Sequence, residues 1–241
     1  MAMNGQQIIR DKDSLSFESD TVNTRFNYKQ LILPGALIGY GFAGLNSHWI
    51  KSINHDIRDN VQQNIDRKVS IDDFTRYVPA VSVYALNVLG IEGKNNLKDR
   101  TIILATSFIL VNGAVSGLKA FINVKRPDGS SNDSFPSGHT ATAFAGAEFL
   151  WQEYKDVSVW YGVAGYAVAT GTGLFRIYND RHWLTDVAAG AGIGILSTKA
   201  AYWLNPFIKN KIFGRKKTKV GFMLTPFYNG RQTGCGFVMH F

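Results

Sequence analysis

The chain has 241 residues, of which 45% are apolar and 18% charged, and its formal net charge is +8 at pH 7. That length allows one domain with a substantial core, and the single cysteine, Cys235, excludes an internal disulfide. The positive charge favours anionic partners, but a nucleic-acid role is not expected, because no aromatic interleaving or recognised binding module accompanies the basic residues.

Residues 1–30 form a polar segment without an apolar core of the kind that signal peptides carry. No cleavable leader is therefore visible in this sequence. The start Met1-Ala2-Met3 resembles a cloning scar, which leaves open a leader that precedes the sequence given.

Six apolar segments follow, and each predicts a helix. The first, third and fifth contain no Asp, Glu, Lys or Arg and approach or reach the ~20 residues that span a bilayer. The fourth carries Glu148 and the sixth carries Lys199. The sequence predicts an all-α, six-helix membrane bundle, with helices at 31–50, 77–91, 101–118, 140–151, 157–175 and 187–208. Between the first two, residues 54–73 read as a charged amphipathic connector.

The first polar motif consists of Lys119, Arg126 and Pro127. Seven residues are about two helical turns, so we expect both cations on nearly one helical face before Pro127 ends the helix. Arg126 can hold two phosphate oxygens in a planar fork, while Lys119 acts as a point charge. The alternative is a basic cluster at a membrane boundary.

The second motif is Pro136-Ser137-Gly138-His139, directly before an alanine-rich run. This order predicts a helix N-terminus, whose free N–H groups bind anions. Ser137 would add a hydroxyl donor, Gly138 would let an anion approach the backbone, and His139 would act as general acid. The alternative is an ordinary serine cap after a proline turn.

The third motif contains Arg176, His182 and Asp186. Because His182 and Asp186 are four residues apart at an expected helix start, we predict that they share a helical face. Asp186 would then accept the Nδ1 proton and leave Nε2 of His182 as the nucleophile, while Arg176 supplies a second phosphate fork. A surface pair that supports the helix start is the alternative.

Together the three motifs resemble the signature of the type 2 phosphatidic acid phosphatase superfamily, and the likeness in segment layout extends over residues 31–204. The resemblance implies a metal-independent lipid phosphatase that forms a phosphohistidine. Its implied substrates are phosphatidate-like glycerolipids, a polyprenyl diphosphate or the phosphates of lipid A. No cofactor and no metal site are expected, since the sequence shows no separate metal-ligand cluster. Phe175 departs from the family pattern, which has a small hydroxyl residue before the arginine.

The C-terminal region changes in composition. A basic run at 209–219 fits anchoring beside a membrane. Asn229-Gly230 between two apolar runs predicts a short β-hairpin. We therefore divide the chain into a polar N-terminal segment (1–30), a helical phosphatase domain (31–208), and a basic segment with hairpin (209–241).

Six spans with both termini in the cytoplasm would place fifteen Lys and Arg inside and ten outside. This orientation brings all three motifs to one outer face. It predicts a bacterial inner-membrane enzyme with a phosphorylated lipid as partner and its site towards the periplasm. Three alternatives stay open: a soluble periplasmic acid phosphatase with the same residues, a vanadium haloperoxidase, and a catalytically silent lipid-binding membrane protein. The oligomeric state is not predicted.

Overall fold

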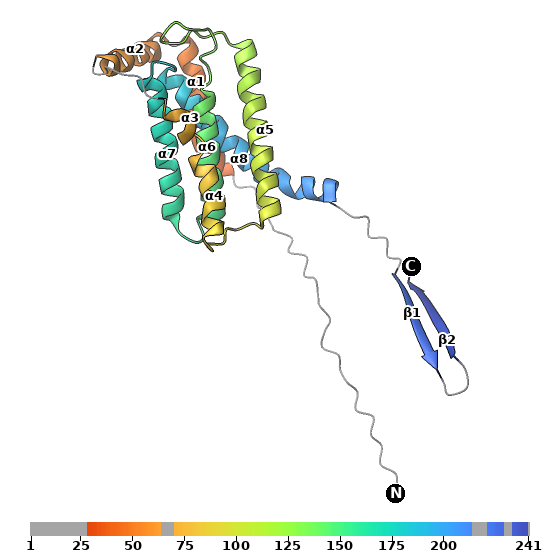
Figure 1. The fold of residues 1–241 in the computed structure, drawn as a ribbon. Coiled ribbons are helices and arrows are strands. Elements are labelled where there is room, and N and C mark those ends of the chain that lie inside the picture. The colour runs from red at the N-terminus through yellow and green to blue at the C-terminus, as the bar shows by residue number, and fades with distance from the viewer. Residues whose placement is uncertain (1–27, 64–69, 214–220, 229–232, 241) are drawn as a thin grey trace.

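The computed structural model describes residues 28–63, 70–213, 221–228 and 233–240. These residues form a helical bundle and one pair of strands (Figure 1). The elements in chain order are a 3-10 turn η1 (Tyr28–Leu31), α1 (Ile32–Asn46), α2 (His48–Gln62), α3 (Asp72–Thr75), α4 (Val78–Val88), α5 (Leu97–Phe121), α6 (Gly138–Tyr154), α7 (Val159–Tyr178), α8 (Leu184–Phe213), β1 (Gly221–Tyr228) and β2 (Thr233–His240).

Helix α6 lies at the centre of the bundle. It packs against α4, α5, α7 and α8, and α1 packs against α8. Small side chains of α6, such as Ala141 and Ala145, are fully buried, and larger ones such as Phe149 and Tyr154 fill the core further along the helix. The predicted all-α fold is confirmed, with the helices of the bundle close to the apolar segments of the sequence.

The crossing of α6 and α8 depends on glycine. A Cβ atom at Gly194 would lie 2.2 Å from the carbonyl oxygen of Ala141, and one at Gly190 would lie 2.5 Å from that of Ser137. No side chain fits at these distances, so only glycine lets the two backbones approach so closely. As a result, the start of α8 lies against the start of α6, where the Ser137 amide donates to the Asp186 carbonyl at 3.0 Å.

Charged side chains inside the bundle are paired with one another. Glu148 of α6 lies 2.6 Å from the Lys199 ammonium of α8, which accounts for the two charges in otherwise apolar segments. Glu153 accepts a hydrogen bond from the buried Arg100 at 3.3 Å and another from the Tyr202 hydroxyl at 2.5 Å. Buried charges need such partners, because an unpaired one is costly away from water.

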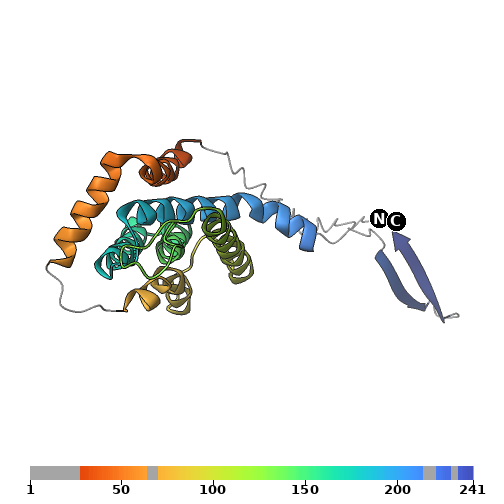
Figure 2. The same cartoon turned by 90° about the horizontal axis from the view of Figure 1, so that it is seen from above.

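The first apolar segment does not form one helix over 31–50, as the sequence predicted. Helix α1 ends at Asn46, and Ser47 caps a second helix, α2, by accepting from the Ile50 amide at 3.4 Å. Figures 1 and 2 show α2 projecting sideways across one end of the bundle. The prediction was wrong at this point because Ser47 can cap a new helix, a preference that apolar composition alone does not report.

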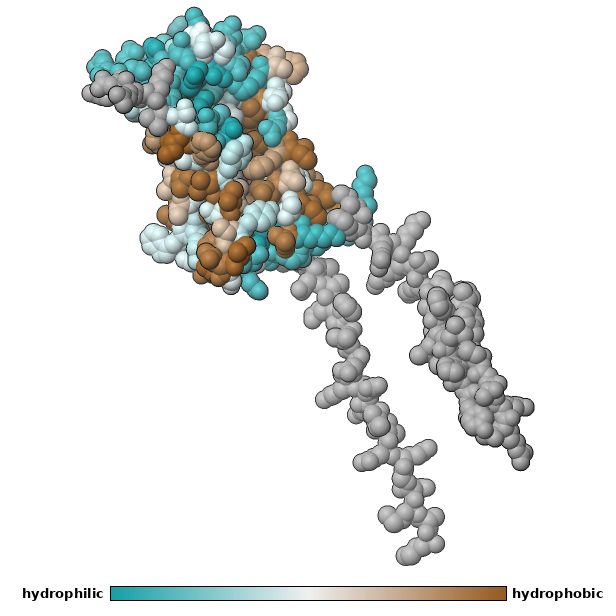
Figure 3. Space-filling view, viewed as in Figure 1, coloured by the Kyte–Doolittle hydropathy of each residue, from teal (hydrophilic) through white to brown (hydrophobic). Residues whose placement is uncertain are grey.

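Apolar side chains gather on the outside of the bundle at mid-height, and polar ones gather at the end where α2 lies (Figure 3). Ile109 is 71% exposed and Leu174 57% exposed, for example. Among the described residues, α5 is the one helix long and apolar enough by itself to cross a membrane, and α4 is a shorter apolar helix. Exposed apolar surface of this extent indicates a non-aqueous neighbour.

Strands β1 and β2 pair antiparallel, from Gly221 opposite His240 to Tyr228 opposite Thr233. The predicted Asn229-Gly230 turn lies outside the described residues, so the hairpin as a whole stays a prediction. The N-terminal segment up to residue 27 and most of the basic run, residues 214–220, are also outside them.

Candidate active site

The three sequence motifs converge at one end of the bundle, which we call the site end. Here α5 and α7 end and α6 and α8 begin, and each contributes polar residues. A cavity of about 320 Å³ opens between them. It is lined by Ser70, Asp72, Asp73, Arg126, His139, Arg176, Asn179 and Arg181.

His182 is buried in the turn before α8. Its Nδ1 lies 2.8 Å from the carbonyl oxygen of Ser134 and 3.6 Å from a carboxylate oxygen of Asp186. Because a carbonyl only accepts, Nδ1 carries the proton and the Nε2 lone pair is left free. Burial lowers the pKa of His182, which keeps the imidazole neutral.

The expected helical face shared by His182 and Asp186 is wrong, since α8 begins only at Leu184. Asp186 instead accepts from the Trp183 amide at 2.9 Å and from the Ser134 hydroxyl. These bonds stabilise the start of α8 and tie it to the loop that holds the His182 Nδ1. The role of Asp186 in orienting His182 stays a prediction. Asp186 would act partly through Ser134, which bonds to both residues.

The two basic residues of the first motif do not share a helical face either. Helix α5 ends at Phe121, and Arg126 lies in the following loop. Pro127 disfavours helical geometry at the residue before it, and the chain is instead held by a bond from the Ser134 amide to the Val124 carbonyl at 2.9 Å. The loop nevertheless brings Arg126 and Lys119 to the same carboxylate.

That carboxylate belongs to Asp133, which the sequence analysis did not single out. Arg126 donates to it at 3.1 Å through Nη2, with Nε 3.0 Å from the other oxygen, and the Lys119 ammonium lies 3.6 Å away. Bonding from the Ser131 hydroxyl, together with the two cations, lowers the pKa of Asp133 well below its usual range. Lys119 and Arg126 thus already hold an oxyanion in this structure.

Ser137 caps α6 as the sequence alternative proposed. Its hydroxyl oxygen accepts from the Thr140 amide at 3.4 Å, and the side chain is fully buried. Among the hydrogen bonds of the described residues, none uses the N–H of Gly138 or His139 as donor. These amides point along the start of a helix, where they are suited to bind an anion.

Arg176, at the end of α7, donates to the carboxylate of Asp72 in α3. The same carboxylate accepts from the Asn179 side chain at 3.0 Å. Phe175 packs edge-to-face with Tyr178 and lines a separate apolar cavity beside α2 rather than the polar cavity. Phe175, which departs from the family pattern, therefore does not line the polar cavity.

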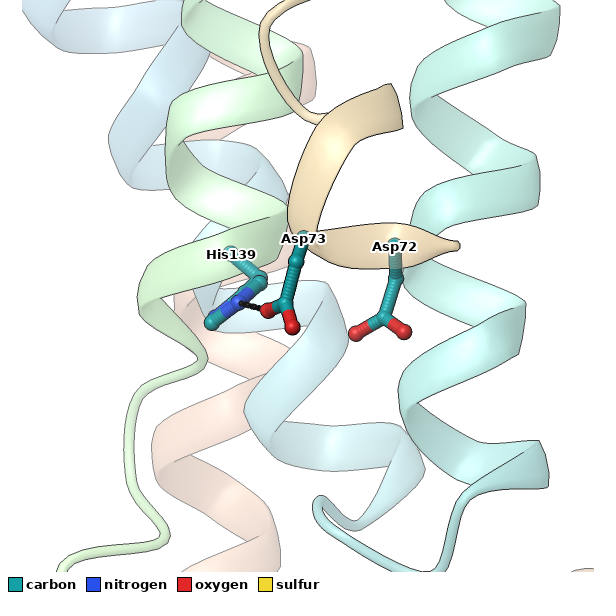
Figure 4. A group of neighbouring side chains, drawn as sticks. All are labelled: Asp72, Asp73 and His139. Carbon is teal, nitrogen blue, oxygen red and sulfur yellow. Dashed lines mark hydrogen bonds and ion pairs between the residues drawn. The ribbon is translucent and has the colours of Figure 1, made fainter. Parts of the chain in front are cut away.

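His139 meets the second acidic residue of α3. Its Nε2 lies 2.7 Å from an Asp73 carboxylate oxygen (Figure 4), and Nη1 of Arg76 lies 3.1 Å from the same nitrogen. The hydrogen bond lowers the pKa of Asp73. Neither Asp72 nor Asp73 was recognised as a site residue, although two adjacent aspartates shortly before an apolar segment were the available signal.

Asp72, Asp73 and His139 also form the one group of possible metal ligands among the described residues, with ligand atoms within 4.8 Å of one another (Figure 4). No such cluster was expected from the sequence. Each of the three already bonds to protein groups, and the guanidinium groups of Arg76 and Arg176 contact the cluster. Two adjacent cations disfavour a further divalent cation there.

The loop between α7 and α8 is fastened by two further ion pairs. Arg181 contacts Asp128 at 3.0 Å, and Arg58 of α2 contacts Asp180 at 2.7 Å. Asp180 has a positive φ of 59°, which the tight turn before His182 requires. These ion pairs link the loop to its neighbours.

Comparison with known proteins agrees with this arrangement. Residues 100–209, which include every motif residue, match the model of the PAP2 superfamily. A lipid A 1-phosphatase of Porphyromonas gingivalis is 40% identical over 139 residues, covering 57% of this chain and 31% of that protein. The bacitracin transport permease protein BcrC of Bacillus licheniformis is 35% identical over 75 residues, covering 31% of this chain and 35% of that one.

Among solved structures, a transmembrane PAP2-type phosphatidylglycerolphosphate phosphatase of Bacillus subtilis matches with a TM-score of 0.51 and 20% identity, over 76% of this chain and 98% of that chain. This likeness supports the fold. The chain spans about a third of the length of the curated relatives it matches. The matched segment, the motifs and the fold all resemble the PAP2 superfamily.

Proposed function

We propose that the protein is a membrane phosphatase that removes phosphate from a lipid through a phosphohistidine formed on His182. One observation carries the proposal: a buried His182 bonded through Nδ1, with Nε2 left free, at the same end of the bundle as the cations of the three motifs. Phosphoryl transfer needs mainly positioning and charge stabilisation, which Lys119, Arg126 and Arg176 would supply.

In the proposed first step, the Nε2 lone pair of His182 attacks phosphorus while the bond from phosphorus to the lipid oxygen breaks. His139 gives that oxygen its proton, and the amides of Gly138 and His139 bind the phosphoryl oxygens beside Ser137. In the second step, water gives a proton to the now neutral His139 and attacks phosphorus. The P–N bond breaks, and His182 and His139 return to their starting states.

The substrate class is proposed from the relatives. The Porphyromonas protein is named for the 1-phosphate of lipid A, and the Bacillus structure for phosphatidylglycerolphosphate, so a lipid phosphate fits both names. Lipid A is the first candidate because its relative has 40% identity to this chain. The exposed apolar surface supports a membrane-embedded domain over 31–208, with the site end facing the periplasm as the charge bias suggests.

The test is a phosphate-release screen with the full chain purified in detergent. The substrates are lipid A, phosphatidate, a polyprenyl diphosphate and an aryl phosphate, each with and without EDTA. We expect a lipid phosphate to be the best substrate, no effect of EDTA, and an acid-labile phosphoenzyme when the reaction is quenched with base. Absence of phosphate release from all four substrates would contradict the proposal.

Fractionation tests the membrane part separately. We expect the full chain in the pellet after a high-speed spin and its release only with detergent. Recovery in the supernatant without detergent would favour the soluble acid phosphatase instead. Access of a membrane-impermeant thiol reagent to Asp156→Cys and Asn123→Cys, in a Cys235→Ser background, reports which end of the bundle faces the periplasm.

A further inference from the structure

Helix α3 has only four residues, yet both of its ends are fastened to α7. At one end Asp72 bonds to Arg176 and Asn179, and at the other the hydroxyl of Thr75 lies 2.9 Å from that of Thr172. Asp73 lies between these contacts and is directed towards the start of α6 (Figure 4). The backbone that carries Asp73 is therefore held by α7 as well as by the bond to His139.

An ionised Asp73 places the His139 proton on Nε2, because a carboxylate oxygen and a bare imidazole nitrogen repel each other at the observed 2.7 Å. Nη1 of Arg76 lies 3.1 Å from the same nitrogen and would favour the opposite tautomer if it donated to the ring. We assign it instead to the Asp73 carboxylate as a charge contact, since the Arg76 charge also lowers the pKa of Asp73. The low pKa of Asp73 keeps its carboxylate ionised and able to accept.

The second nitrogen, Nδ1, is left free. None of the described residues forms a hydrogen bond with it, and His139 lines the same cavity as Arg126 and Arg176. The charged groups that face His139 are Asp72, Asp73, Arg76 and Arg176, and burial together with the charge of Arg176 lowers the pKa of His139 to about 4. An approaching phosphate would neutralise the two guanidinium groups and so favour a second proton on the ring.

We infer that Asp73 is a positioning residue for His139: it holds the proton on Nε2, so that Nδ1 exchanges the other proton with the leaving oxygen and then with water. This inference rests on the proposed function. It gives the two histidines opposite arrangements, since His182 is held through Nδ1 and uses Nε2. Asp73 gains importance as the leaving oxygen becomes more basic, because only a basic leaving group must be protonated as it departs.

The experiment compares two substrates that differ in the leaving group. Dodecyl phosphate releases an alcohol, as lipid phosphates do, and nitrophenyl phosphate releases a phenolate that needs no proton. For Asp73→Asn we expect kcat on dodecyl phosphate to fall ~100-fold, at the low end of what a general acid contributes, and kcat on nitrophenyl phosphate to change by about threefold or less. The ratio of the two rates is independent of how much protein is folded.

Two further variants sharpen the test. Asp72→Asn releases Arg176 and should slow both substrates alike, mainly through KM, and Asp156→Asn makes the same chemical change in an exposed loop at the far end of the bundle and should alter neither. In a His139→Ala background, Asp73→Asn should have no additional effect on dodecyl phosphate.

Equal loss on the two substrates, or additive losses with His139→Ala, would overturn the role of Asp73. A wild-type protein that hydrolyses neither substrate would instead contradict the proposed function itself. Asp73→Glu offers a rescue, because it keeps a carboxylate, whereas Asp73→Asn leaves only a neutral acceptor. The substrate ratio of Asp73→Glu should therefore lie closer to wild type than that of Asp73→Asn.

Discussion

The two halves of the bundle both contain buried charges, but they use them differently. In the half away from the site, the buried Arg100 pairs with Glu153, and this contact joins α5 to α6 across the core. At the site end, Arg126 and Arg176 also pair with carboxylates, yet they line an open cavity of about 320 Å³. The Asp133 side chain that neutralises Arg126 is 47% exposed.

This difference separates structural from functional polar groups in a bundle. A pair closed off by packed side chains has a fixed partner and contributes only to the fold. A pair whose acidic member is exposed and borne on a loop, as Asp133 is, can exchange that member for a ligand of the same charge. Substitutions in the closed pair should therefore lower stability, and substitutions at the site end should change activity or ligand binding.

The largest effect is expected at His182. His182→Ala removes the proposed nucleophile and should reduce phosphate release by about a thousandfold or more, with no loss of helical content by circular dichroism. The matched control is His48→Ala, an exposed histidine at the start of α2. A His182→Ala protein that retained the wild-type rate would show the nucleophile assignment to be wrong.

Arg100→Met tests the opposite half. The Arg100 and Glu153 side chains are 2% and 0% exposed, so removing one partner leaves a buried charge and should lower stability by about 3–5 kcal/mol. Thermal unfolding in detergent measures the loss, and kcat of the remaining folded protein should stay within about twofold. A large fall in kcat at unchanged stability would mean that this pair is coupled to the site.

Asp133→Asn sharpens the comparison within the site end. It removes the carboxylate that occupies Lys119 and Arg126, so inhibition by vanadate should become about fivefold tighter, the scale expected for a partly exposed ion pair. Inhibition curves for wild type, Asp133→Asn and the exposed control Asp156→Asn check this. Weaker inhibition in Asp133→Asn would indicate that Asp133 positions Lys119 and Arg126 instead of competing with vanadate for them.

The pH dependence should reflect the burial of His182. Because its pKa is lowered from the ordinary 6.5, the imidazole stays unprotonated and nucleophilic below that pH, and the acid limb of kcat/KM should lie below 6.5. The same shift has a cost in stability: the unfolded chain binds the proton more readily, so stability falls as pH drops below 6.5 towards the folded pKa. A limb at or above pH 6.5, after allowing for titration of the substrate, would contradict this.

The smallest effect is expected at Phe175. Its side chain lines the apolar cavity beside α2 and not the polar cavity. Phe175→Ser should therefore change kcat/KM by about threefold or less, because substitutions away from the site have small effects. A strong rise in activity would show that a hydroxyl at this position does reach the phosphate.

The sequence predicted what is encoded locally. Apolar runs located the helices of the bundle, and the cap at Ser137 could be read from the residues around it. The motif residues were correctly expected to meet at one end. Helix ends were less predictable. Helix α1 stops at Asn46, inside the predicted range 31–50, and α5 stops at Phe121, just beyond the predicted range 101–118.

The carboxylates that face the motif cations were missed. Asp72 meets Arg176 across 104 residues and Asp73 meets His139 across 66, and no periodic pattern reports such pairs. The roles of the motif residues remain predictions, since their positions are compatible with the proposed chemistry without demonstrating it.

The glycine crossing of α6 and α8 has a practical meaning for altering this protein. Since Gly190 and Gly194 leave no space for a methyl group, that interface accepts almost no variation, and the spacing between the starts of the two helices is effectively constant. Adaptation to a new substrate is easier in α2, which borders two cavities without such contacts. Directed evolution of this scaffold should therefore concentrate its library on residues 48–62 and leave the crossing of α6 and α8 unchanged.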